Sequence, residues 1–132
     1  MAGVDGPNHP LIDRPGGRQN LATPALVLDL DRLEANIATM AAHCARVGLA
    51  LRPHAKTHKS AEIARRQIAA GAVGICCATI REAEALAAGG IEGILVTSPL
   101  TTRAKLDRLT RLLATGADVS VVVDAVEGVD AV

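Results

Sequence analysis

Residues 73–97 read VGICCATIREAEALAAGGIEGILVT, and this stretch decides the fold class. A short apolar run stands at each end, and a segment with a helical signature lies between them. Thr79 and Glu82 have the three-residue spacing of a capping box, and Gly89-Gly90 is typical of a helix end. The stretch therefore predicts a strand, a helix and a second strand.

The same alternation extends over most of the chain. Each apolar run is short and rich in Val, Ile or Leu, as expected of strands buried on both faces. Helical patterns follow the first four runs, and this order predicts parallel strands with right-handed crossovers. The runs begin, at intervals of 21 to 25 residues, near Leu26, Ala50, Val73, Ile94 and Val119.

The first helical pattern is the clearest, with apolar residues spaced three and four apart. Asp31 and Glu34 predict a capping box at its start, Asp29 is a further cap candidate, and Gly48 predicts its end. The second helix is expected from near Ser60 to Gly71, and the fourth from Thr101 or Thr102 to Gly116. The first apolar stripe consists of Leu30, Leu33, Ile37, Met40, Cys44 and Val47.

Two architectures fit this alternation, an open doubly wound sheet and a closed (β/α)8 barrel. An open sheet usually has a glycine-rich phosphate loop after its first strand, whereas residues 28–31 (LDLD) contain no glycine. The barrel is therefore favoured. A complete barrel needs about 250 residues, so 132 residues predict a partial (β/α)8 TIM-type barrel. A fragment is favoured over a half-barrel paired with a second copy, because an open half-barrel exposes edge strands.

Composition excludes several classes of protein. The net charge is zero, which argues against a nucleic-acid surface. No apolar run reaches the ~20 residues of a membrane helix. Three cysteines without CxxC spacing predict a cytoplasmic protein without structural zinc. Residues 1–22, rich in Pro and Gly, predict a mobile or loosely docked arm, and residues 23–132 the barrel portion. The absence of Phe, Tyr and Trp also suggests part of something longer.

The segment 52–59, RPHAKTHK, carries the chemistry. It follows the second expected strand, and in β/α barrels residues at the carboxyl ends of strands face the active site. Arg52, His54 and Lys56 would share one face if the strand extends that far. Desolvation and the neighbouring cations favour a neutral Lys56 amine, which is the form that attacks a carbonyl. The pattern suits a Schiff base with an aldehyde.

Structural explanations of the same segment remain open. A lysine at a strand end is more often a solvated surface residue, and a cluster of cations can simply bind a phosphate. His54 and His58 are four residues apart, a metal-ligand spacing on a helix. They lie instead across a strand-to-loop junction with no acidic residue between them, so a hydrogen-bonding role is favoured for both. Cys76 and Cys77 are interpreted as small buried residues on opposite faces of a strand.

The segments 23–29 (TPALVLD), 52–59 (RPHAKTHK) and 74–79 (GICCAT), with Glu82-Ala83, resemble the D-threonine aldolase and eukaryotic-type D-serine dehydratase family. That family belongs to the alanine-racemase-like pyridoxal-phosphate enzymes of fold type III. The resemblance covers roughly residues 22–126. It implies that Lys56 forms the Schiff base with pyridoxal 5′-phosphate and that Arg52 and His54 line the cofactor pocket. It also implies that residues 25–29 lie outside a barrel that begins near residue 50.

The resemblance further implies a lyase that acts on D-amino acids with a β-hydroxyl group. An aldolase would break the Cα–Cβ bond to give glycine and an aldehyde, and a dehydratase would give a keto acid and ammonia. A divalent metal would assist, with ligands outside these 132 residues, as the remaining phosphate-binding loops would be. The complete protein is expected to be a homodimer, and the 132-residue chain alone is expected to be inactive.

Three other interpretations remain. An amino-acid racemase shares the fold and the lysine. A non-catalytic pyridoxal-phosphate carrier also holds its cofactor by a strand-end lysine, but usually without Arg-Pro-His before it. A phosphate-binding barrel would use no pyridoxal at all.

Overall fold

The computed structural model describes residues 6–132 of the chain. The chain divides into two compact units, residues 1–33 and residues 34–132, and each is described by itself. The predicted boundary between an arm and a barrel portion near residue 22 stays a prediction. Within the described residues no helix is both long and apolar enough to cross a membrane.

The first unit contains two short 3-10 helices, η1 (His9–Leu11) and η2 (Gly17–Asn20). Asn8 joins the two ends of this segment, because its Nδ2 donates to the carbonyl of Ala22 at 3.2 Å and its Oδ1 accepts from the N–H of Ala22 at 2.7 Å. Residues 6–22 of the expected arm thus have local structure of their own. Residues 1–5 of that arm lie outside the described residues.

The strand expected near Leu26 does not form in this chain. Residues 25–29 have no paired strand, and the side chains of Leu26, Val27 and Leu28 are exposed. An isolated extended segment has no backbone partner for its N–H and C=O groups, so apolar composition alone does not make it a strand.

Helix α1 spans Leu30–Arg46 and agrees with the predicted first helix, but its cap differs. Oδ1 of Asp29 accepts from the N–H of Arg32 at 3.1 Å, so Asp29 provides the cap. The predicted capping box of Asp31 and Glu34 is wrong. The helix begins at Leu30, two residues earlier than that box requires, which places Asp31 inside the first turn. Glu34 instead pairs with Arg66.

The second unit is built on three parallel strands, β1 (Ile75–Cys77), β2 (Ile94–Val96) and β3 (Val119–Val121), in that order. Their register aligns Cys76 with Leu95, and Leu95 with Ser120. The expected strand near residue 50 is reduced to one parallel bridge between His54 and Cys76. A parallel α/β arrangement is therefore confirmed.

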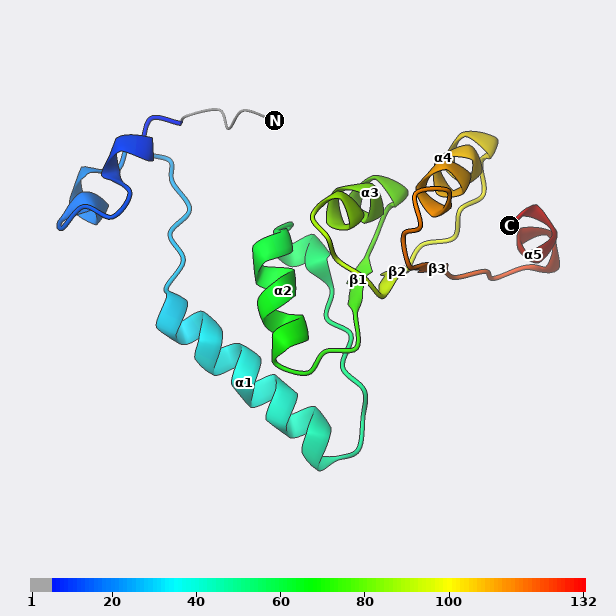
Figure 1. Cartoon of the computed structure of the whole chain (residues 1–132), viewed down its shortest axis with the longest axis horizontal. Coiled ribbons are helices and arrows are strands. Elements are labelled where there is room, and N and C mark those ends of the chain that lie inside the picture. Colours follow the sequence, from blue (N-terminus) through cyan, green and yellow to red (C-terminus); the bar gives the residue numbers. More distant parts are fainter. Residues whose placement is uncertain (1–5) are drawn as a thin grey trace. The chain divides into compact units, whose positions relative to one another are not determined.

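Helices α2 (Ala61–Ala69), α3 (Ile80–Ala88) and α4 (Arg103–Leu113) alternate with these strands, as expected. The predicted cap Thr79 accepts the backbone N–H of Glu82. Ser60, near which the second helix was expected to start, accepts that of Ile63. Figure 1 shows α3 and α4 next to each other beside the strands. A short helix that the sequence did not predict, α5 (Val126–Ala131), follows β3.

The core lies between the strands and these helices. Ile75, Cys77, Ile94 and Val96 are fully buried, while the residues between them are only partly buried. One face of the sheet is therefore covered and the other is open. The covering helical residues are all small or aliphatic, which suits a chain without aromatic residues, namely Ala64, Ile80, Ala83, Leu86, Leu109 and Leu112.

Candidate active site

The open face of the sheet carries the predicted site residues. His54 pairs with Cys76, and the register continues through Leu95 to Ser120. Since successive side chains on a strand point to opposite faces, these residues share the face that the helices leave uncovered. In a closed β/α barrel this face would be the interior, whose carboxyl end holds the active site.

Lys56 follows this row directly, in the 3-10 helix η3 (Ala55–Thr57). The extended backbone ends at His54, so the expected strand does not reach Lys56. The turn still leaves the lysine at the carboxyl edge of the sheet, close enough for its charge to lower the pKa of His54. Within residues 6–132 no ion pair involves the Lys56 ammonium.

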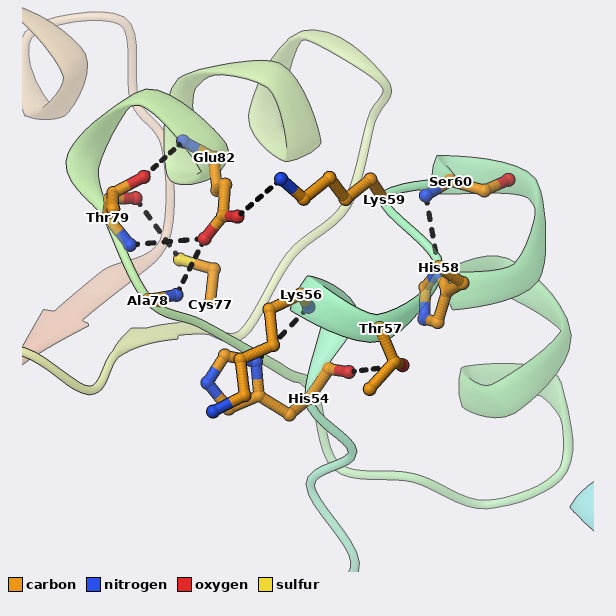
Figure 2. A network of polar contacts seen from close by, with 10 residues as sticks. All are labelled: His54, Lys56, Thr57, His58, Lys59, Ser60, Cys77, Ala78, Thr79 and Glu82. Carbon is orange, nitrogen blue, oxygen red and sulfur yellow. Dashed lines mark hydrogen bonds and ion pairs between the residues drawn. The ribbon is translucent and has the colours of Figure 1, made fainter.

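The expected desolvation of Lys56 is absent from this chain. The Lys56 side chain is exposed, because three strands do not close into a barrel that could shield it. In Figure 2 the side chain runs toward the ring of His54, away from Glu82. Lys56 is thus an accessible amine on the open face of the sheet.

His54 links three parts of this site. Its Nδ1 accepts a hydrogen bond from the backbone N–H of Lys56 at 3.2 Å, which caps η3. Its Nε2 lies 3.2 Å from Oγ1 of Thr97, which follows β2. Burial, and then the charge of Lys56, lower the pKa of His54, while Glu82 partly opposes them. The predicted hydrogen-bonding role of His54 is confirmed.

Arg52 is directed toward the opposite end of the sheet. Its guanidinium donates to the carbonyl of Gly93, just before β2, and lies next to Gly74, just before β1. His54 and Lys56, by contrast, lie near the carboxyl ends of these strands. The structure therefore brings His54 and Lys56 together at the carboxyl edge of the sheet. It places the Arg52 guanidinium apart from them, at the amino ends of β1 and β2.

Lys59 and Glu82 form a second link in the same region. Nζ of Lys59 is 3.8 Å from Oε1 of Glu82. The other oxygen of Glu82 accepts the N–H groups of Ala78 at 2.8 Å and Thr79 at 3.2 Å (Figure 2). The capping box predicted for Thr79 and Glu82 is confirmed, and Glu82 additionally tethers the loop that follows Lys56.

His58 also has a structural role. Its Nδ1 accepts from the N–H of Ser60 at 3.1 Å, as expected of a hydrogen-bonding histidine. Its Nε2 and the Oε1 of Gln67 are both buried, and neither makes a hydrogen bond of good geometry with the described residues. Burial lowers the pKa of His58, and the side chain of Gln67 and the backbone of Ser60 oppose this in part.

The two adjacent cysteines lie on opposite faces of β1, as predicted, but only Cys77 is buried and Cys76 is partly exposed. Cys77 is buried in the core, where burial, then the charges of Glu82 and Cys76, raise the pKa of its thiol to about 11. Cys76 lies on the open face and its Sγ donates to the carbonyl of Arg52 at 3.5 Å. A thiol with so high a pKa is mostly protonated at neutral pH, so Cys77 acts as a small core residue.

Sequence reasoning missed Thr97 as a residue of this site. One signal could have identified it, because Thr97 directly follows the apolar run of β2, at the same carboxyl edge as His54. Its contact with His54 joins residues 43 positions apart. As for metal binding, residues 6–132 contain no group of three or more His, Cys, Asp or Glu side chains that could hold an ion.

A parallel sheet with helices alternating along it places the chain in the class of α/β domains built from β/α units. Comparison with known proteins narrows this class, because residues 28–132 match the alanine racemase N-terminal domain. The chain belongs to this family. The predicted fold class is thereby confirmed.

Curated relatives and solved structures agree with this assignment. The chain is 44% identical over 128 residues to 3-hydroxy-D-aspartate aldolase from Paracoccus denitrificans, covering 96% of the chain and 32% of that relative. It is 50% identical over 102 residues to D-threonine aldolase from an Arthrobacter species, covering 77% of the chain and 27% of that relative. The chain thus spans about a third of the length of the curated relatives it matches.

Two solved structures have the same fold as this chain. D-threonine aldolase from Filomicrobium marinum matches with a TM-score of 0.80 and 43% identity, covering 85% of the chain and 30% of that protein. D-threo-3-hydroxyaspartate dehydratase from Delftia sp. HT23 matches with a TM-score of 0.78 and 41% identity, covering 84% and 29%. The resemblance to aldolases and dehydratases is therefore confirmed.

Proposed function

We propose that the complete protein is a pyridoxal-phosphate-dependent lyase that cleaves D-amino acids bearing a β-hydroxyl group into glycine and an aldehyde. The observation that carries the proposal is the Lys56 amine at the carboxyl edge of the sheet, which makes no ion pair within residues 6–132, in a chain related to two named aldolases. Dehydration of the same class of substrate is the second candidate, because the Delftia dehydratase has the same fold.

The lysines of the segment 52–59 differ in a way that supports Lys56 as the cofactor residue. An amine must be free to attack the aldehyde carbon of the cofactor. Lys59 is paired with Glu82, whereas Lys56 extends over the open face beside His54. The residues present therefore fit a carbonyl ligand at Lys56 better than at Lys59.

The roles of the other predicted residues follow from their positions. His54 holds the backbone of Lys56 and lies beside its side chain, so we propose that it lines the cofactor site. The guanidinium of Arg52 contacts Gly93 just before β2, so we propose that it supports the amino ends of the strands. Contact between Arg52 and the cofactor stays a prediction, and the position of the Arg52 guanidinium does not favour it.

Pyridoxal phosphate supplies an electron sink for the bond broken at Cα when it is bound. The described residues of this chain supply the attachment point and part of the wall beside it. A divalent metal, with ligands outside the chain, and a homodimer of the complete protein stay predictions, as does a cytoplasmic location.

Reductive trapping tests the attachment point directly. The complete polypeptide is incubated with pyridoxal phosphate, reduced with borohydride, digested and analysed by mass spectrometry. We expect the pyridoxyl mass on Lys56, its loss in Lys56→Ala, and its retention in the matched control Lys59→Ala. A label on Lys59 with Lys56 unmodified, or no label at all, would overturn the proposal.

Product analysis then separates the reactions. D-threonine, D-serine and D-threo-3-hydroxyaspartate are supplied to the complete protein loaded with pyridoxal phosphate and not reduced, and glycine, aldehyde, keto acid and ammonia are measured. Glycine with an aldehyde is expected of an aldolase. A keto acid with ammonia identifies a dehydratase, and inversion at Cα identifies a racemase. A protein that trapping labels at Lys56 but that shows no turnover before reduction identifies a carrier.

A further inference from the structure

Thr97 lies at the carboxyl end of β2, where its hydroxyl and its backbone contact the same acceptor. The backbone N–H of Thr97 donates to the carbonyl of Cys77 at 2.9 Å, and Oγ1 donates to the same carbonyl at 3.1 Å. A hydroxyl group has one hydrogen to donate. Its hydrogen is therefore used by Cys77, and Oγ1 can only accept from any other partner.

That other partner is His54, whose Nε2 lies 3.2 Å from Oγ1 of Thr97. Since Oγ1 can only accept, Nε2 must carry a hydrogen. On the other side of the ring, Nδ1 accepts the backbone N–H of Lys56 and must therefore carry none. The two contacts agree on one form of the ring, the neutral tautomer with its hydrogen on Nε2.

The other forms of the ring conflict with these contacts. A hydrogen on Nδ1, in either the second neutral tautomer or the imidazolium ion, would place two donors against each other at the N–H of Lys56. The charged groups that act on this ring are Lys56, which disfavours the imidazolium ion, and Glu82, which favours it. Burial also disfavours the ion, so the surroundings and the hydrogen bonds favour the same neutral form.

We propose that Thr97 is a positioning residue that fixes the His54 tautomer and, through Nδ1 of His54, holds the backbone of Lys56 in place. This inference concerns the lysine of the proposed function and rests on that function for its role in the reaction. Thr97 does not contact the reacting amine itself. It acts through His54, which caps the turn from which the Lys56 side chain extends.

The first test needs no substitution. In the complete polypeptide labelled with ¹⁵N, long-range proton–nitrogen spectra of the imidazole rings report which nitrogen of His54 carries the hydrogen. We expect the hydrogen on Nε2 at neutral pH. A His54 with its hydrogen on Nδ1 overturns the proposal, whether or not Lys56 binds pyridoxal phosphate.

The second test uses a matched pair of variants. Thr97→Val removes the hydroxyl and keeps the branched shape, whereas Thr97→Ser keeps the hydroxyl. Loss of one hydrogen bond is expected to slow borohydride-trapped labelling of Lys56 by roughly two- to tenfold. The valine variant should also shift His54 toward a mixture of tautomers, and serine should restore both readouts.

The outcomes separate this inference from the proposed function. If Lys56 is labelled in Thr97→Val at the native rate and His54 keeps its tautomer, the Thr97 proposal is wrong while the lyase proposal stands. If Lys56 is never labelled, the lyase proposal fails, and the ring spectra still decide the role of Thr97. Should Thr97→Val fail to fold, the tautomer in the native protein and in Thr97→Ser decides the question.

Discussion

The guanidinium of Arg52 lies in the space that a side chain at Gly74 would need. A Cβ atom at Gly74 would be 2.5 Å from Nη1 of Arg52 and would also collide with the carbonyl oxygen of Gly93. The glycine before β1 thus makes room for the arginine before the lysine-bearing turn. This contact links the start of the segment 52–59 to the amino-terminal end of the sheet.

Gly74→Ala should therefore destabilise the fold strongly. Overpacking costs about 1–3 kcal/mol, and here one of the obstructing atoms is backbone, which cannot turn away. The matched control is Gly90→Ala. The φ angle is positive at both glycines, 154° at Gly74 and 75° at Gly90, but at Gly90 no atom lies within 4 Å of the added Cβ. The control should cost only the roughly 1–2 kcal/mol of a left-handed residue. Urea denaturation measures both, and equal losses would contradict the packing role of Arg52.

The caps of α3 and α4 offer a second matched comparison. Thr79 accepts the N–H of Glu82 at 3.2 Å, whereas Thr102 at the start of α4 makes no capping hydrogen bond with its side chain. Thr79→Ala should lower the free energy of unfolding by about 1 kcal/mol. Thr102→Ala should change it far less. Thermal or urea unfolding compares the variants, and a larger loss from Thr102→Ala would refute this explanation.

Acid should destabilise the chain through two histidines. Burial is the largest cause that lowers the pKa of His54 and of His58 below 6.5, their ordinary value. Between these lowered values and 6.5 the unfolded chain binds more protons than the folded chain, so stability rises with pH there. The contribution of these two histidines to the free energy of unfolding is therefore complete above pH 6.5, and it is lost as the pH drops through the pKa values of the folded state.

Urea unfolding between about pH 5 and 8 measures this slope. Replacing His54 and His58 together by Asn removes both titrating groups. The double variant should be less stable at neutral pH, because ring contacts are lost, but its stability should depend less on pH. An unchanged slope in the double variant would assign the acid sensitivity to other groups.

Local patterns explain where the prediction from sequence succeeded. Thr79 and Glu82 are three residues apart, and a capping box depends on contacts within one helical turn. The start of α1 shows the limit of such reasoning, because Asp29 and Asp31 are both suitable caps by composition. Only the backbone shows that the helix begins at Leu30, which leaves the cap to Asp29.

The sequence by itself determined the alternation of strands and helices, the buried apolar runs and the lysine segment, because each depends on neighbours within about one helical turn or one strand. Only the tertiary structure decided that the Arg52 guanidinium lies against Gly93, that Thr97 meets His54, and that Lys56 is exposed. Those relations join residues about 40 positions apart, or depend on how many strands surround a side chain. Short-range periodicity carries no information about either, since it fixes which face a residue takes but not what stands opposite that face.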